Sequence, residues 1–283
     1  MTSHESRSLD LEPRTLGTLW IGPELGPVEQ LCLLSFLEHG HDVKLYTYEP
    51  VSGIPPGVAV ADAREVFDAQ KIVRHKKTKS AALHSDLFRY ALLAKTSRMW
   101  VDLDLFCLQP FIFPSAYVYG QEDDATVNGA ALALPADSKV LKQLLSYLPE
   151  SKGYPPFFRL RDKIRYFIKF GGRKPNITEW PWGALGPRGL SYHLKEAGDF
   201  DKALPVQAFY PLPLIKVADL LVPGLVRSEH FGPDVFAVHL WASQLRKLLL
   251  ADYQGLIPVG SFLQVEMARL GEKFNYPLAL RVR

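Results

Sequence analysis

The sequence lacks several features that would place a chain in a common class. Only two of its 283 residues are cysteines, and both, Cys32 and Cys107, lie in apolar segments. Two such residues do not make a disulfide framework or the paired spacing of a zinc site, so they are expected to be reduced core residues. No apolar run approaches the roughly 20 residues that a membrane-spanning helix needs. The composition therefore predicts neither a disulfide-stabilised module nor a membrane helix.

A large excess of one charge is also missing. The chain has 33 Lys and Arg against 30 Asp and Glu, a formal net charge of +3, so general nucleic-acid binding is not expected. Residues 1–14 are polar and lack the apolar core of a secretory signal, so we expect a disordered tail and a cytoplasmic protein. No linker or internal repeat interrupts the rest, and residues 15–283 are expected to form one domain.

The sequence does contain an alternation of strand and helix patterns. Residues 15–22 have the pattern of a strand, Pro27 and Gly40 suit the start and end of a helix, and residues 42–48 alternate as a second strand. A strand–helix–strand unit predicts a parallel sheet and an α/β fold. Further strands are expected at 58–63, 117–123, 131–135 and 236–241, and further helices at 80–95, from Asp137 and around Pro187.

Two carboxylates interrupt an otherwise apolar stretch, SRMWVDLDLFCLQP at 97–110. If this stretch is one buried strand, Asp102 and Asp104 point to the same face, because alternate residues of a strand do so. Two like charges at that spacing repel and need a compensating partner, and paired carboxylates suit Mg²⁺ or Mn²⁺. Acid-x-acid triplets are common on surfaces, and the apolar surroundings distinguish this one.

A second charged pair precedes this stretch, on the helix expected at 80–95. Asp86 and Arg89 are three residues apart and therefore share a helix face. The pair could be an ordinary surface salt bridge. Beside the two aspartates, however, Asp86 could accept hydrogen bonds from hydroxyls, and Arg89 could hold a phosphate or a carboxylate. A sugar nucleotide requires all of these groups.

The stretch SDLFRYALLAKTSRMWVDLDLFCLQP resembles the DXD-containing glycosyltransferases of the sugar-binding-region family. That family includes bacterial lipopolysaccharide and capsule transferases and is distantly related to the clostridial toxin glucosyltransferases. The shared pattern is a helix with S-D-x-x-R-Y, a short turn and an apolar strand ending in D-x-D. Residues 96–98 depart from the family's usual glycine pair, and residues 19–22 match its W-I-G-like opening strand. The pattern is filled here by Ser85, Asp86, Arg89, Tyr90, Asp102 and Asp104.

The resemblance, which covers about residues 16–135, implies a GT-A fold: a Rossmann-like, mostly parallel sheet flanked by helices. It implies a nucleoside diphosphate sugar, expected to be a UDP-sugar, bound through Mn²⁺ or Mg²⁺. The implied catalytic residues are Asp86, Arg89 and Asp102. The implied nucleotide-sugar-binding residues are Trp20, stacked on the base, with Ser85, Asp86, Arg89, Asp102, Asn128 and Trp241. Trp20 could equally be a core tryptophan, and the Asn128–Gly129 pair could be a plain turn.

A third metal ligand is expected near the end of the chain. His239 lies in the apolar strand 236–241, where an imidazole would complete a site with Asp102 and Asp104 and would suit Mn²⁺. The alternative is a core histidine with satisfied hydrogen bonds.

Residues 157–175 form a basic insertion in which seven Lys and Arg alternate with aromatic and aliphatic residues. One interpretation is a helix with one buried and one solvated face. The other is a contact with an anionic acceptor or with a membrane surface.

These observations lead us to expect a metal-dependent, retaining glycosyltransferase acting on a glycan or glycolipid acceptor, with retention implied by the resemblance alone. Two alternatives stay open. A haloacid-dehalogenase-type phosphatase also places D-x-D after an apolar strand, but it requires Thr or Val where this chain has Phe106. A non-catalytic module that binds sugar nucleotides or glycans would have the same residues without turnover.

Overall fold

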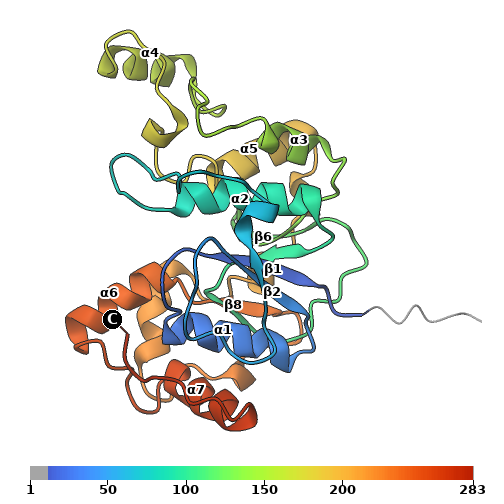
Figure 1. Ribbon diagram of the computed structural model, residues 1–283, viewed down its shortest axis with the longest axis vertical. Helices are drawn as coiled ribbons and strands as arrows, with labels where there is room; N and C mark the ends of the chain where they lie inside the picture. The colour runs from blue at the N-terminus through green and yellow to red at the C-terminus, as the bar shows by residue number, and fades with distance from the viewer. Residues whose placement is uncertain (1–11, 283) are drawn as a thin grey trace, which may run out of the picture.

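The computed structural model describes residues 12–282 and contains two β-sheets (Figure 1). The larger sheet has six strands in the order β3-β2-β1-β4-β7-β6, and the smaller pairs β5 with β8. The strands are β1 (Leu16–Trp20), β2 (Val43–Thr47), β3 (Ala59–Asp62), β4 (Met99–Val101), β5 (Leu105–Cys107), β6 (Val118–Asp123), β7 (Thr126–Ala133) and β8 (Ala237–His239).

Seven α-helices and six short 3-10 segments complete the described part of the chain. The α-helices are α1 (Pro27–Glu38), α2 (Ala82–Lys95), α3 (Lys139–Leu145), α4 (Leu160–Lys169), α5 (Pro187–Ala197), α6 (Ala242–Asp252) and α7 (Phe262–Lys273). The 3-10 segments are Ala63–Glu65, Ile177–Glu179, Phe200–Lys202, Val206–Ala208, Leu214–Leu221 and Ser228–His230. Along residues 12–282, no helix is both long and apolar enough to cross a membrane.

The larger sheet is mostly parallel, which confirms the predicted α/β class. Strand β1 pairs in parallel with β2 on one side and with β4 on the other, and β3 continues the parallel arrangement beside β2. Strands β7 and β6 extend the sheet beyond β4 with antiparallel pairing. The chain therefore moves outward from β1 to β3 and then returns to the far side of β1 as β4. This reversal makes the gap between β1 and β4 a topological switch point, where α/β sheets bind ligands.

Helices cover both faces of the larger sheet: α2, α3 and α5 lie on one side, and α1, α6 and α7 on the other (Figure 1). On the α1 side, Phe36 packs in a core cluster with Leu45, and on the α2 side Phe88 packs with Tyr46. Neighbouring residues of β2 thus enter different cores, as expected for a parallel sheet that is buried on both faces.

A third core cluster joins α1 to the C-terminal helices and to β8. It includes Leu31 of α1, Val238 of β8, Leu249 of α6 and Met267 of α7. The sequence patterns did not predict α6 and α7, because the last element they indicated was the strand at 236–241. Cys32 and Cys107 are buried and free, which confirms the expectation of reduced core residues.

The structure corrects two local predictions, and a third falls mostly on residues that it does not describe. The N-cap of α3 is Ser138, whose hydroxyl accepts from the Leu141 amide at 3.1 Å, and not Asp137. Asn128 and Gly129 lie within β7, so the Asn–Gly turn interpretation is wrong. Residues 1–11 of the expected tail lie outside the described residues. At its end, Arg14 donates to the Phe113 carbonyl at 2.9 Å.

Candidate metal and nucleotide site

The D-x-D segment is a turn between the two sheets and not the middle of one strand. Strand β4 ends at Val101, the Asp102 amide makes a last hydrogen bond to the Ala130 carbonyl of β7 at 2.7 Å, and residues 103–104 form a turn. The chain then continues as β5, which pairs with β8. The expectation of two aspartates on one strand face is therefore wrong, because the chain changes its pairing partner between them.

The two carboxylates nevertheless converge, and His239 joins them. Leu105 lies opposite His239 in the β5–β8 pair, so the imidazole comes beside Asp104, and Nε2 of His239 is 3.3 Å from Oδ1 of Asp104. One potential ligand atom from each of Asp102, Asp104 and His239 lies within 4.8 Å of the others. Within residues 12–282, this is the one group of three or more such side chains close enough to hold a metal ion.

This donor set fits a divalent cation. Two ligands of one ion at about 2.1 Å are at most about 4.2 Å apart, so small side-chain adjustments suffice. The side chains of Asp102 and Asp104 are 25% and 21% exposed, whereas that of His239 is 7% exposed. The carboxylates are thus open to a ligand on one side. Two oxygens and one imidazole nitrogen can ligate a divalent metal ion, with the remaining positions left for phosphate or water oxygens.

Asp102 is fixed by two donors that reach it from within the fold. Nε1 of Trp100 donates to its Oδ1 at 2.7 Å, and Nη2 of Arg89 donates to the same oxygen at 3.0 Å. Burial raises the pKa of Asp102, the charge of Arg89 opposes this rise, and the net shift is upward. Trp100 was not predicted as a site residue. Its signal was its position two residues before Asp102, which places the two side chains on the same side of an extended chain.

Asp104 is held by residues from the C-terminal part of the chain. Its Oδ2 accepts from the Ala242 amide at 3.0 Å, at the N-terminus of α6, and its Oδ1 lies beside His239. Burial raises the pKa of Asp104, but the charge and hydrogen bond of His239 and the Ala242 amide outweigh it, and the pKa is lowered. Burial lowers the pKa of His239, but the charge and hydrogen bond of Asp104 raise it by more, so the net shift is upward. The two acids of the motif are therefore held in different electrostatic surroundings.

Asp86 and Arg89 share a face of α2, as their spacing indicates, but the face is buried. Asp86 is 7% and Arg89 6% exposed, which excludes a surface salt bridge. Nη2 of Arg89 lies 3.7 Å from Oδ1 of Asp86, and Nη1 donates to the Gly129 carbonyl at 3.0 Å. Burial raises the pKa of Asp86 to about 7, against the lowering effect of Arg89, while Asp102 adds to the rise. One guanidinium thus links the two acidic groups.

Two glycines make room for this linked pair. A Cβ atom at Gly129 would be 2.7 Å from Nη1 of Arg89, and one at Gly186 would be 3.2 Å from both carboxylate oxygens of Asp86. Gly186 is also the N-cap of α5, which has Pro187 in its first turn, so the helix expected around Pro187 is confirmed.

Trp20 lies at the carboxyl end of β1, next to β4 in the sheet. Its ring is half-buried: it packs against the core and also lines a cavity of about 340 Å³ together with Tyr48 and Arg64. Tyr48 follows the neighbouring strand β2, so the cavity lies outside the carboxyl ends of adjacent parallel strands. Trp20 is therefore partly a core residue and partly a cavity wall.

The other expected binding residues lie around this centre with local partners of their own. Ser85 is half-buried in the first turn of α2, directly before Asp86. The side-chain Nδ2 of Asn128 donates to Oε2 of Glu122 at 2.8 Å. Its Oδ1 accepts from the backbone amide of Ala130 at 3.0 Å. The Trp241 ring packs edge-on against His239, with ring centroids 4.2 Å apart.

Tyr210 is a further neighbour that the sequence did not indicate. Its buried ring lies 5.5 Å from that of His239, centroid to centroid. It follows a 3-10 segment, and no local pattern connects it with the D-x-D turn. Its position depends on the tertiary fold alone.

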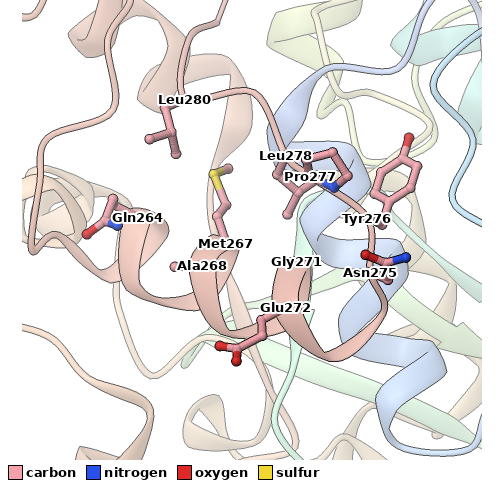
Figure 2. Close-up of a pocket in the computed structure, with 10 residues that line it drawn as sticks. All are labelled: Gln264, Met267, Ala268, Gly271, Glu272, Asn275, Tyr276, Pro277, Leu278 and Leu280. Carbon is pink, nitrogen blue, oxygen red and sulfur yellow. The ribbon is translucent and has the colours of Figure 1, made fainter.

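A cavity of about 420 Å³ lies elsewhere, between α7 and residues 275–280, and Figure 2 shows its lining. Met267, Leu278 and Leu280 point into it from both segments. None of the expected site residues lines this cavity, so we assign it no part in the chemistry.

Comparisons with known proteins give a likeness among solved structures. No protein-family model and no curated protein matches the chain. Among solved structures, the PaToxG glycosyltransferase is similar, with 14% identity and a TM-score of 0.43, over 94% of this chain and 87% of that chain. A likeness of this size establishes neither an activity nor a ligand. The interpretation of the site therefore depends on its own geometry.

Proposed function

We propose that the chain is a metal-dependent glycosyltransferase that moves a sugar from a UDP-sugar to a glycan or glycolipid acceptor, with retention of configuration. The observation that carries the proposal is the group formed by Asp102, Asp104 and His239, beside the switch point between β1 and β4. A divalent cation, Mn²⁺ or Mg²⁺, fits this group. When bound there, it would neutralise the charge of the diphosphate leaving group.

Two groups of residues would hold the two ends of the donor, the base and the sugar. Trp20 and Tyr48 line the cavity beyond β1 and β2, where a uracil ring can stack. Asp86, buried beside Arg89, can exchange hydrogen bonds with sugar hydroxyls. Arg89 acts on Asp102, since its guanidinium fixes Oδ1 of that carboxylate. Ser85, Asn128 and Trp241 keep their expected binding roles as part of the proposal.

An acceptor route is supported by a cleft of about 580 Å³ beside α4. Its lining includes Lys76, Lys77, Lys169 and Trp182. A smaller pocket that Asp86 lines shares three residues with this cleft: His75, Pro181 and Trp182. Basic and aromatic side chains suit an anionic glycan or the head of a glycolipid. We propose that the acceptor approaches the donor sugar from this side.

Retention and location are proposed on grounds other than the geometry of the site. Retention depends on the resemblance of the S-D-x-x-R-Y and D-x-D pattern, and the anomeric configuration of an isolated product, read by NMR, tests it. The cytoplasmic location stays a prediction from composition.

The phosphatase alternative is disfavoured by the surroundings of Asp102. In that chemistry the first aspartate attacks phosphorus, whereas Oδ1 of Asp102 already accepts from both Trp100 and Arg89. Hydrogen bonds of this kind lower the nucleophilicity of a carboxylate. Phe106, at the position where Thr or Val would be needed, is buried in β5.

The test is release of UDP from a panel of UDP-sugars, with water replacing the acceptor. We expect slow release with Mn²⁺, loss of release with EDTA, and loss in Asp104→Asn. Asp124→Asn changes an exposed acid in the same way and should leave release intact. Binding of UDP-sugars without release, with or without an acceptor, would favour the non-catalytic module. Metal-dependent hydrolysis of a simple phosphomonoester, lost in Asp102→Asn, would favour the phosphatase.

A further inference from the structure

Helix α4 lies apart from the layers that form the core. It spans Leu160–Lys169 and is drawn at one end of the long axis of the molecule, beyond α2 and α5 (Figure 1). None of its residues is buried. The expectation of a helix with one buried and one solvated face is therefore wrong, although the helix itself is amphipathic.

The side of α4 that contacts the rest of the segment is aromatic. The Tyr166 ring lies 4.8 Å from that of Phe158 and 5.5 Å from that of Phe170, centroid to centroid. Asp162, one turn earlier on the same side, is half-buried. The helix is thus anchored through Tyr166. Its opposite side is mostly exposed, although the Phe167 ring there lies beside Gly172.

That opposite side is a continuous apolar stripe. At 100° per residue, its four large residues fall within a sector of about 100°, the width of a face that a helix normally buries. Instead they are exposed: Leu160 by 74%, Ile164 by 51%, Phe167 by 51% and Ile168 by 73%. An apolar face of this kind, left largely exposed by its own chain, indicates a binding surface.

Basic residues border the stripe on both sides. Arg161 and Lys163 lie at its two edges, and Arg165 and Lys169 lie farther round the helix. All four are exposed, and Asp162, the single acid of the helix, lies on the anchored side. An apolar stripe edged with Lys and Arg is complementary to an anionic bilayer, whose acyl chains accept the stripe while its phosphates meet the basic side chains.

We propose that α4 docks this chain on the surface of an anionic membrane. The stripe enters the boundary between headgroups and acyl chains, and the helix lies parallel to the membrane plane. A second copy of the chain is a poorer occupant, because pairing two stripes would bring the edge residues Arg161 and Lys163 of both copies together. The proposal concerns a different surface from the metal and nucleotide site, so either can fail without the other.

The test is co-sedimentation of the full chain with vesicles of phosphatidylcholine alone and of phosphatidylcholine with phosphatidylglycerol. We expect binding to the anionic vesicles, weakened by added salt, and little binding to the neutral ones. Ile164→Glu should weaken binding by about tenfold or more, since one large side chain no longer enters the bilayer. Ile215→Glu changes a residue that is 90% exposed outside α4 and should bind as the parent does.

Equal binding by Ile164→Glu and the parent would overturn the proposal, as would absence of the parent from the anionic vesicle pellet. Circular dichroism of each variant checks that the fold is retained, and Arg161→Glu provides a second variant that removes charge instead of apolar surface. Analytical ultracentrifugation completes the test. A dimer that Ile164→Glu dissociates, together with no vesicle binding, would assign the stripe to a second copy and contradict the membrane.

Discussion

Helices α2 and α4 carry similar residues in opposite surroundings. Both combine arginine with large apolar residues at helical spacing, yet ten of the fourteen residues of α2 are buried and none of the ten in α4 is. In α2 the charged pair Asp86 and Arg89 lies inside the protein. In α4 the apolar stripe lies outside. Charged residues usually lie at the surface and apolar residues inside, so both helices depart from the usual arrangement. We propose that a donor sugar binds beside α2 and a membrane beside α4.

The sharpest test of this contrast removes one arginine from each helix. Arg89→Ala would leave Asp86 and Asp102 without their shared cation and the Gly129 carbonyl without its donor. Removing one partner of a buried ion pair costs about 3–5 kcal/mol. Arg165→Ala, on the exposed helix, should change the free energy of unfolding by less than about 0.5 kcal/mol.

Urea denaturation of the two variants measures both values. If both variants lost the same small amount of unfolding free energy, the Asp86–Arg89–Asp102 arrangement would not be a buried network in solution. A large loss for Arg165→Ala would mean that α4 is packed against the protein more closely than its exposure indicates.

An apolar pair gives a second, smaller contrast. Leu87 of α2 is 5% exposed, whereas Ile164 of α4 is 51% exposed. Leu87→Ala should destabilise the fold by roughly 2–4 kcal/mol, because it leaves a cavity in the core cluster that includes Ile177 and Trp180. Ile164→Ala should have almost no effect on the melting temperature. Similar shifts for the two variants, by differential scanning calorimetry, would contradict the description of α4 as an uncovered helix.

The pH dependence of stability gives a third contrast. The pKa of Asp86 is raised from its ordinary 3.8 to about 7. Between these values the folded protein therefore holds the proton more tightly than the unfolded chain, and stability falls as pH rises. For one group the slope is at most about 1.4 kcal/mol per pH unit. Asp86→Asn should flatten this part of the stability profile, and Asp162→Asn on α4 should not. An unchanged slope in Asp86→Asn would mean that Asp86 is ionised without cost.

The sequence indicated which side chains the structure brings together better than it indicated their geometry. The three-residue spacing of Asp86 and Arg89 defines a shared helix face, and the structure places the pair on one. Asp102 and Asp104 were expected on one strand because the apolar run continues through Leu105. No local pattern shows that the chain leaves β7 as its partner and pairs next with β8, more than 100 residues later.

The fold was predictable where local patterns agree with tertiary packing. The strand–helix–strand unit from β1 to β2 follows from residues near its ends, such as Pro27 and Gly40. The side of α4 that contacts the protein was not predictable, because its apolar stripe has the spacing of a core face. That the anchoring side is the one with Tyr166 depends on the positions of Phe158 and Phe170, which no periodicity reveals.

The central claim is that Asp104, together with Asp102 and His239, holds a divalent cation that a nucleoside diphosphate needs for binding. Isothermal titration calorimetry of UDP into the parent and Asp104→Asn, each with Mn²⁺ and with EDTA, tests it most directly. We expect Mn²⁺ to strengthen UDP binding to the parent and to have no effect on the variant. Trp20→Ala is the matched control, which should weaken binding by roughly 1–3 kcal/mol in either condition. The same Mn²⁺ dependence in Asp104→Asn as in the parent would contradict the account.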